Sequence, residues 1–435
     1  MVKQPILYAL LFCYCLGLKA QAGEERSIII TTLDSIELPC PNNKPPSHLQ
    51  FSGDTAVFYL LANSATLYFY SLVRKTVADS MFLPMPISDF FPPNNFYYIG
   101  NCNLSQKGIP VYFKVTPNWI YTENDLGYAL WSRNGVLLEN GYFQAPRKGK
   151  AWYTAEPRAS FYSALLGTYV YKPVVRARPR FEKRNSDKLA PFNFEKEYYA
   201  ASNYTLACYR VLSNPCTSPR VKNSCRFLGR KARIFQRSLF DFLKHSYAYY
   251  LYHTHLAIDE VAAKLYIGFA SEPQITVTDT AGNQLCTFGE KGKHIKENVL
   301  PCAVPKNLVE QIEKRPFYRK SIENQCLIYS LSQLERFSAR YQTLFWDSYQ
   351  KFLFRWYEFP TVSPYFQPPF IEGQYMKNYG LQVYDEKGKL LADEVVYSPF
   401  KFLCANSDGT YWVAARRGCK GAGSYMLFRI RLVIP

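Results

Sequence analysis

The sequence predicts a mainly β protein with α additions, an α+β fold of several β-sandwich-like or hairpin modules that is stabilised by disulfides. Three observations predict this fold. Tyr and Phe, which favour strands, number 36 and 31 in a chain of 435 residues. Many short apolar runs end at Pro, Gly, Asn or Asp, as strands do. One stretch near 318–356 instead carries apolar residues at three- and four-residue steps, which predicts one long amphipathic helix.

The first 22 residues read as a secretory signal peptide. Lys3 supplies the positive charge, the apolar run Ile6–Leu18 is too short to span a bilayer, and Ala22 ends a small-residue cleavage pattern. We therefore expect a mature chain that begins at Gly23 and is secreted or periplasmic. No apolar run of about 18 residues follows, so the sequence predicts no transmembrane segment in the mature chain.

The cysteine count favours an oxidising compartment. Of 12 cysteines, two lie in the signal peptide, and the even number that remains predicts up to five disulfides. The expected pairs are Cys404–Cys419, Cys286–Cys302 and Cys40–Cys102. The pairing of the other cysteines stays open. The alternative is free buried thiols, and zinc is less favoured because no C-x-x-C motif occurs.

Changes of pattern along the chain predict four units after the signal peptide. They are an N-terminal β-rich domain over 23–179, a basic cysteine-containing segment over 180–265 that ends in helices, a β-hairpin and the long helix over 266–358, and a C-terminal β module over 359–435.

The strand-like regions contain recognisable hairpins. In the first domain the runs on either side of Asn134-Gly135 alternate, and this dipeptide predicts a type I′ turn because both residues tolerate positive φ. Segments 127–141, 274–289 and 380–395 share one rhythm of strand, polar turn with Gly, and strand. We interpret this rhythm as shared organisation and not as a sequence repeat.

Helical periodicity is expected in two places. Apolar residues from Ile234 to Leu265 fit a helical stripe in two pieces. The stretch 318–356 predicts the longest helix, which would extend roughly 50 Å at 1.5 Å per residue. Pro360 and Pro364 end this pattern, since proline cannot continue a helix.

Positive charge is concentrated in the middle of the chain. The formal net charge is +18, and the stretch 172–237 holds 16 Lys and Arg against four acidic residues. Such a field attracts anionic glycans, lipid headgroups or nucleic acid, and nucleic acid is the least expected of these for an exported chain. The alternative is a solvated basic linker. The candidate anion-binding residues are Arg176, Arg178, Arg180, Lys183, Arg184, Arg230, Lys231 and Arg233.

Catalytic and cofactor motifs are missing from the sequence. There is no G-x-S-x-G elbow, no H-E-x-x-H and no phosphate-binding loop, so no catalytic residue and no cofactor are predicted. His253 and His255 are the weak metal candidates, because on a strand both imidazoles would face one side, with Asp259 or Glu260 as a third ligand. A packed histidine pair is the favoured alternative.

These features favour an exported, non-enzymatic binding or structural protein that contacts anionic glycans or surfaces through the 172–237 stretch. Abundant tyrosine suits a contact surface, because it offers large area with few rotatable bonds. The alternatives are a secreted hydrolase with an unrecognised catalytic site and a surface component that assembles with itself or a protein partner through strand edges. Asn103 and Asn203 begin N-glycosylation acceptor triplets.

The basic stretch gives the first testable prediction. Charge reversal of Arg176, Arg178 and Arg180 to Glu should lower the salt concentration at which the protein elutes from heparin, because fewer cations then face the sulfate groups. The effect should shrink as salt rises, since charges farther apart than about 8 Å are screened at 0.15 M. Elution of the triple variant at the parent's salt concentration would identify the stretch as a solvated linker.

Overall fold

The computed structural model describes sixteen segments of the chain, and all of them are strands, turns or short connections without a helix. The described residues are 28–40, 46–52, 55–85, 108–124, 127–142, 152–154, 164–166, 169–177, 203–210, 225–227, 254–270, 272–295, 339–360, 377–396, 400–415 and 424–434. The fold is therefore all-β, and the expected α+β class is wrong.

Within these residues the strands form six antiparallel sheets, five of four strands and one of five. Blade 1 contains β2 (Pro46–Ser52), β3 (Ala56–Leu61), β4 (Thr66–Ser71) and β5 (Thr76–Phe82). Blade 2 contains β6 (Tyr112–Val115), β7 (Trp119–Glu123), β8 (Gly127–Ser132) and β9 (Leu137–Tyr142). Blade 3 contains β10 (Trp152–Thr154), β11 (Ala164–Leu166), β12 (Tyr169–Ala177), β13 (Asn203–Arg210) and β14 (Cys225–Phe227).

The other three sheets complete the molecule. Blade 4 contains β15 (Thr254–Asp259), β16 (Lys264–Phe269), β17 (Ile275–Asp279) and β18 (Gln284–Phe288). Blade 5 contains β19 (Arg340–Asp347), β20 (Phe352–Pro360), β21 (Lys377–Tyr384) and β22 (Leu390–Val396). Blade 6 contains β23 (Phe400–Ala405), β24 (Thr410–Ala415), β25 (Ser424–Val433) and β1 (Ile29–Pro39).

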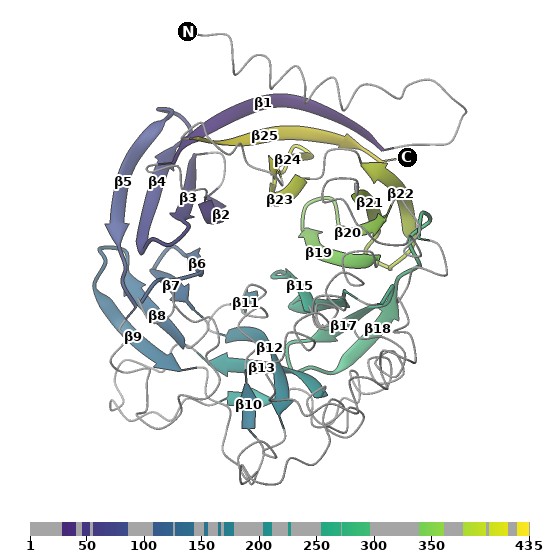
Figure 1. The fold of residues 1–435 in the computed structure, drawn as a ribbon, viewed down its shortest axis with the longest axis horizontal. Helices are drawn as coiled ribbons and strands as arrows, with labels where there is room; N and C mark the ends of the chain where they lie inside the picture. Colours follow the sequence, from purple (N-terminus) through teal and green to yellow (C-terminus); the bar gives the residue numbers. More distant parts are fainter. Residues whose placement is uncertain are drawn as a thin grey trace, which may run out of the picture.

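The sheets stand around a central axis, as Figure 1 shows, and this arrangement is a β-propeller. The N-terminal strand β1 closes the ring, because it is the outermost strand of the last blade. It pairs antiparallel with β25 from Ile29 opposite Val433 to Pro39 opposite Ser424. One sheet therefore joins the two ends of the chain, and the expected separate β-sandwich-like modules are wrong.

Among the described residues the hydrophobic core lies between neighbouring blades, where buried residues of one sheet pack on those of the next. Between blades 5 and 6, Phe354 packs on Phe402 with ring centroids 4.6 Å apart. Between blades 6 and 1, Trp412 stacks on Phe51 at 5.2 Å. Much of the aromatic composition therefore fills the contacts that hold the ring together.

Polar side chains fasten the same contacts. The Gln50 side chain of β2 donates to the Val115 carbonyl at 2.8 Å and accepts from the Val115 N–H at 2.7 Å, so it pairs with β6 as a backbone would. The Tyr411 hydroxyl of β24 donates to buried Asp347 of blade 5 at 2.7 Å. The Tyr59 hydroxyl donates to the carbonyl of Pro39 at 3.0 Å and joins blade 1 to β1.

The outer hairpins of blades 2, 4 and 5 share one turn geometry. Gly135, Gly282 and Gly388 each adopt a left-handed backbone, with φ of 78°, 84° and 83°. The N–H of each glycine bonds to a carbonyl three residues earlier, as in a type I turn followed by a glycine bulge. Asn134 is absent from the positive-φ residues among those described, so the expected type I′ turn at Asn134-Gly135 is wrong.

The expected long helix over 318–356 is wrong. Residues 318–338 lie outside the described residues, and the rest of the stretch forms β19, a turn and the start of β20. Leu353 to Glu358 are all buried because β20 is covered on both faces, so apolar residues occur on both sides of the strand and also satisfy a helical spacing. Asp347 fixes the turn by accepting the N–H groups of Tyr349 and Gln350 at 2.8 and 3.1 Å.

The helical stripe expected up to Leu265 ends in strands. Residues 254–259 form β15 and residues 264–269 form β16, while 234–253 lie outside the described residues. Asp259 starts a tight turn between the two strands, which the spacing of apolar residues alone did not reveal.

Disulfides do not stabilise the described part of the fold, so that expectation is wrong. Cys40 is buried, Cys286 is exposed and Cys404 is half-buried, and none of these three cysteines forms a disulfide. Their expected partners Cys102, Cys302 and Cys419 lie outside the described residues. Strand pairing between β1 and β25 closes the chain into a ring without a covalent link.

The bond between blades 5 and 6 gives a stability prediction. Tyr411→Phe should lower the free energy of unfolding by about 1.5–3 kcal/mol, because it removes a buried hydrogen bond to the Asp347 carboxylate. Urea denaturation measures the change. Tyr349→Phe is the matched control, since Tyr349 lies in the neighbouring turn with 56% of its surface exposed. Equal midpoints for both variants would show that the bond contributes nothing.

Candidate functional site

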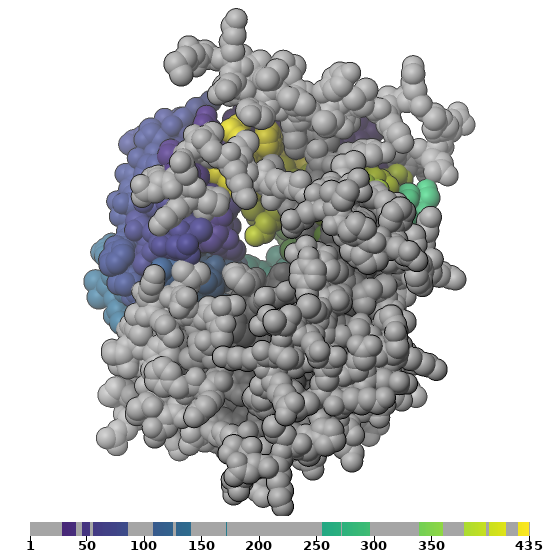
Figure 2. Space-filling model, viewed as in Figure 1, coloured from purple at the N-terminus to yellow at the C-terminus, as the bar shows by residue number. Residues whose placement is uncertain are grey.

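The innermost strands of blades 6, 1 and 2 surround a cavity of about 310 Å³ beside the central axis. Figure 2 shows the opening at the centre of the ring, bordered by blade 1 in purple and blade 6 in yellow. We call the cavity that these strands line the channel site. Its lining residues are His48, Leu49, Gln50, Phe51, Tyr112, Phe113, Lys114, Lys401, Phe402 and Leu403.

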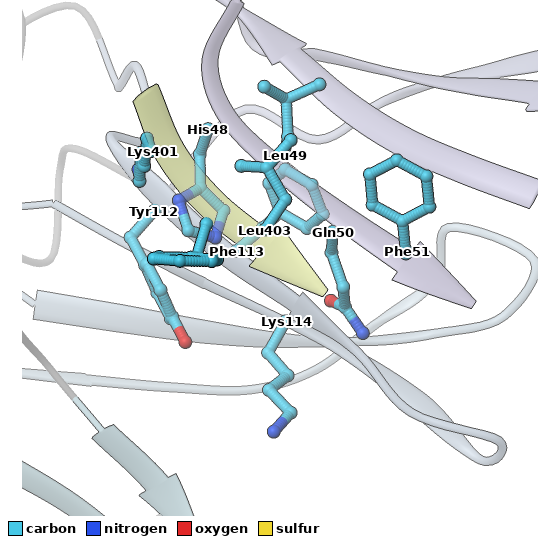
Figure 3. Close-up of a pocket in the computed structure, with 10 residues that line it drawn as sticks. His48, Leu49, Gln50, Phe51, Tyr112, Phe113, Lys114, Lys401 and Leu403 are labelled. Carbon is cyan, nitrogen blue, oxygen red and sulfur yellow. The ribbon is translucent and has the colours of Figure 1, made fainter. Parts of the chain in front are cut away.

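Strand alternation places the polar lining residues. On β2 the buried Leu49 and Phe51 pack between blades, so His48 and Gln50 lie on the opposite side of the strand. On β6 the buried Phe113 and Val115 likewise leave Tyr112 and Lys114 on the other side. On β23 buried Phe400 and Phe402 flank Lys401. Each blade thus presents one or two polar side chains to the same space (Figure 3).

Lys401 is the most distinctive charge of the channel site. Lys401 is exposed along part of its surface, while nearby protein atoms displace water from its ammonium group, and this desolvation lowers the pKa of that group. No ion pair is formed by Lys401 within the described segments. An ammonium group without a carboxylate partner in a cavity is a ready site for an anion.

Lys114 is the second cation, and it already has a partner. Its Nζ forms an ion pair with Oε1 of Glu260, which follows β15 in blade 4. This contact joins two blades that are not neighbours in the ring, since blade 3 lies between them.

His48 is a lining residue whose pKa both lysines affect. Burial lowers the pKa of its imidazole well below 6.5, and the positive charges of Lys401 and Lys114 lower it further. The ring is therefore neutral at neutral pH and offers both a hydrogen-bond donor and an acceptor. Figure 3 shows His48 close to Tyr112, and their ring centroids are 4.5 Å apart.

Tyr112 adds an aromatic ring and a hydroxyl group to the lining of the channel site. Burial raises the pKa of its phenol, and the charges of Glu123 and Glu260 raise it further, so the hydroxyl stays protonated and can donate. Phe113 meets the His48 ring edge-on with centroids 5.0 Å apart. Two lysines, a neutral imidazole and a phenol therefore give the channel site several donors, which suit an anion with polar substituents.

A second polar cluster, between blades 4 and 5, has a structural role. Arg355 is fully buried and its guanidinium donates to the carbonyls of Phe269 at 3.1 Å and Glu272 at 2.5 Å. Its Cζ lies 3.9 Å from the centroid of the Tyr341 ring. Burial lowers the Arg355 pKa to about 10, so the side chain remains charged at neutral pH. Carbonyl groups of blade 4 accept hydrogen bonds from its Nη1 and Nη2 groups, and these bonds join the two blades.

The structure places few of the residues that the sequence singled out. Arg176 lies on β12, opposite Asn203 of β13. The other seven candidates for anion binding lie outside the described residues: Arg178, Arg180, Lys183, Arg184, Arg230, Lys231 and Arg233. The basic stretch and the channel site are thus separate hypotheses.

The histidine pair is described in part. His255 is buried on β15, and His253 lies outside the described residues. The suggested third ligands have other contacts, because Asp259 accepts backbone N–H groups of its turn and Glu260 pairs with Lys114. Among the described residues no group of three or more His, Cys, Asp or Glu could hold a metal ion, and no helix is long and apolar enough to cross a membrane.

Sequence reasoning missed the channel residues altogether. A signal was present, since polar and apolar residues alternate in His48–Phe51, Tyr112–Val115 and Phe400–Phe402. The same alternation occurs in any half-buried strand, however, so it does not single out a site. More than 350 positions separate His48 from Lys401, and only closure of the ring brings them together.

One solved structure supports the fold. The chain is similar to a member of the DUF4221 family from Bacteroides vulgatus, with a TM-score of 0.51, 10% identity, and coverage of 95% of this chain and 100% of that one. It also matches the β-propeller domain of Cps50 (Swd1) from Myceliophteria thermophila, with a TM-score of 0.37, 8% identity and coverage of 93% and 100%. At such identity the first likeness shows the fold alone. No protein-family model and no curated protein matches the chain.

His48 gives a prediction about acid stability. In the folded protein the pKa of the His48 imidazole lies well below 6.5. As the pH falls through 6.5, the imidazole therefore takes up a proton in the unfolded chain and stays neutral in the folded protein. The free energy of unfolding should therefore decrease with falling pH, by at most about 1.4 kcal/mol per pH unit for this group. His48→Gln should reduce the decrease measured by urea denaturation between about pH 7 and pH 5.

The matched comparison is His294, whose pKa burial also lowers. Some acid sensitivity should therefore persist in His48→Gln and diminish again in a variant that also carries His294→Gln. A His48→Gln profile that overlays the parent's would contradict the assignment of a lowered pKa to His48.

Proposed function

We propose that this β-propeller is an exported binding protein that holds a small anionic ligand at the channel site. The observation that carries the proposal is Lys401, an ammonium group in a cavity with no acidic partner among the described residues. The expectation of an exported, non-enzymatic binding protein fits a propeller, whose rigid blades can hold side chains from several strands around one ligand.

The other lining residues define the kind of anion. His48 and the Tyr112 hydroxyl supply uncharged hydrogen-bond groups, and their adjacent rings form an apolar wall. A ligand that combines an acidic group with a flat or ring-shaped carbon skeleton would use all three features. A phosphorylated sugar, or an acidic sugar with two carboxylate or sulfate groups on its ring, has that chemistry.

This ligand class agrees with the basic stretch. If residues 172–237 contact anionic glycans outside the cytoplasm, the stretch would hold the polymer by long-range charge while the channel site binds one acidic sugar residue. Each contact has its own test, because the heparin experiment changes Arg176, Arg178 and Arg180 and leaves the channel site intact.

The proposal predicts that Lys401→Met weakens binding of inorganic sulfate, which serves as a simple anionic probe. Loss of one charged hydrogen bond should reduce affinity about tenfold, and isothermal titration calorimetry at low ionic strength measures it. Lys389→Met is the matched control, because Lys389 is an exposed lysine after the β21–β22 turn. Sulfate binding that is absent in the parent, or equal in both variants, would refute a channel anion site.

A further inference from the structure

Glu260 forms an ion pair with one of the two lysines that could bind an anion at the channel site. Its carboxylate pairs with Lys114, one of the two lysines that line the channel site. It also contributes to the raised pKa of Tyr112, so its charge acts on a second lining residue. A carboxylate of the chain itself is therefore the partner of one of the two channel lysines.

The local fold fixes Glu260 in this position. It is the first residue of the turn between β15 and β16. The preceding Asp259 is buried and its Oδ1 accepts the N–H groups of Val261 and Ala262 at 3.1 and 3.0 Å. Ala263 closes the turn with a left-handed φ of 52°. The Asp259 hydrogen bonds and the left-handed Ala263 define this turn, and Glu260 extends from it to Lys114 of blade 2.

Exposure makes the ion pair easy to displace. The Lys114 side chain keeps 27% of its surface exposed and the Glu260 side chain keeps 54%. Ion pairs this accessible to water contribute little net stability, because solvent screens them and both side chains lose rotational freedom. An external anion that offers Lys114 a better partner can therefore replace Glu260 without disturbing the blades.

The charge balance then decides which ligands benefit. With Glu260 in place, Lys114 is neutralised, and Lys401 is the channel lysine that has no acidic partner among the described residues. A monoanion satisfies Lys401 and leaves the ion pair intact. A dianion can satisfy Lys401 with one negative charge and take Lys114 from Glu260 with the other.

We propose that Glu260 is an intramolecular competitor for the channel anion site and that the site therefore selects ligands with two negative charges. The structural basis is the ion pair of Glu260 with Lys114, together with Lys401, which lines the same cavity and has no acidic partner among the described residues. This inference rests on the proposed function and specifies its ligand class: a dianion such as inorganic sulfate, a phosphate monoester or a dicarboxylate, in preference to a monocarboxylate or a sulfate monoester.

The test compares inorganic sulfate with methyl sulfate, which resembles it but carries a single charge. Calorimetric titration of the full chain should show tighter binding of sulfate in the parent. Glu260→Gln should tighten sulfate binding about three- to fivefold, which corresponds to the small net contribution of an exposed ion pair. Lys114→Met should remove most of the preference for sulfate, because the second cation is lost.

Glu386→Gln is the matched control for Glu260→Gln. Glu386 is exposed and also follows an aspartate, Asp385, whose carboxylate holds a turn, but it lies on an outer hairpin of blade 5. Its substitution removes the same charge from the protein as a whole, and sulfate affinity should stay at the parent value.

A double-mutant comparison separates competition from distant repulsion. If Glu260 competes through Lys114, the gain from Glu260→Gln should largely disappear when Lys114 is already Met. An equal gain in both backgrounds, or no gain beyond Glu386→Gln, would overturn the inference while Lys401-dependent binding of sulfate still supported the proposed function. Loss of that Lys401 dependence would instead refute the proposed function.

Discussion

Closure of the ring by β1 and β25 is the constraint on which the rest of the structure depends. The two ends of the chain meet in one sheet, from Ile29 opposite Val433 to Pro39 opposite Ser424. This pairing fixes blade 6 beside blade 1, and the Trp412–Phe51 stack forms only in that arrangement. Without the closing pair the blades would form an open arc, each end of which would expose an apolar sheet face.

The contacts between blades combine apolar packing with a few directed hydrogen bonds. Rings of Phe, Tyr and Trp fill the space, and groups such as Gln50, Tyr411 and Arg355 set the relative positions of neighbouring sheets. Apolar packing has little directional preference, whereas a buried hydrogen bond is costly to leave unmade. The two together explain why a chain rich in tyrosine forms a ring with defined geometry.

The channel site follows from the same geometry. Innermost strands of three blades bring Lys401, His48 and Lys114 around one cavity, although their positions in the chain are far apart. Concentrated positive charge is unfavourable, and the protein limits it by lowering the pKa of His48 and by pairing Lys114 with Glu260. The function that we propose therefore depends on charges that the fold assembles but does not fully neutralise.

The sequence by itself determined the local structure: β character, short strands, and hairpins with glycine turns such as the one at Gly388. It misjudged 339–356, because a strand buried on both faces, such as Leu353–Glu358, carries apolar residues on both sides and so fits a helical period as well. Only the tertiary structure decided how many sheets surround the axis, that β1 completes the last blade, and that His48 and Lys401 share a cavity. The reason is physical: hairpins depend on neighbouring residues, whereas ring closure depends on packing between sheets distant in the chain.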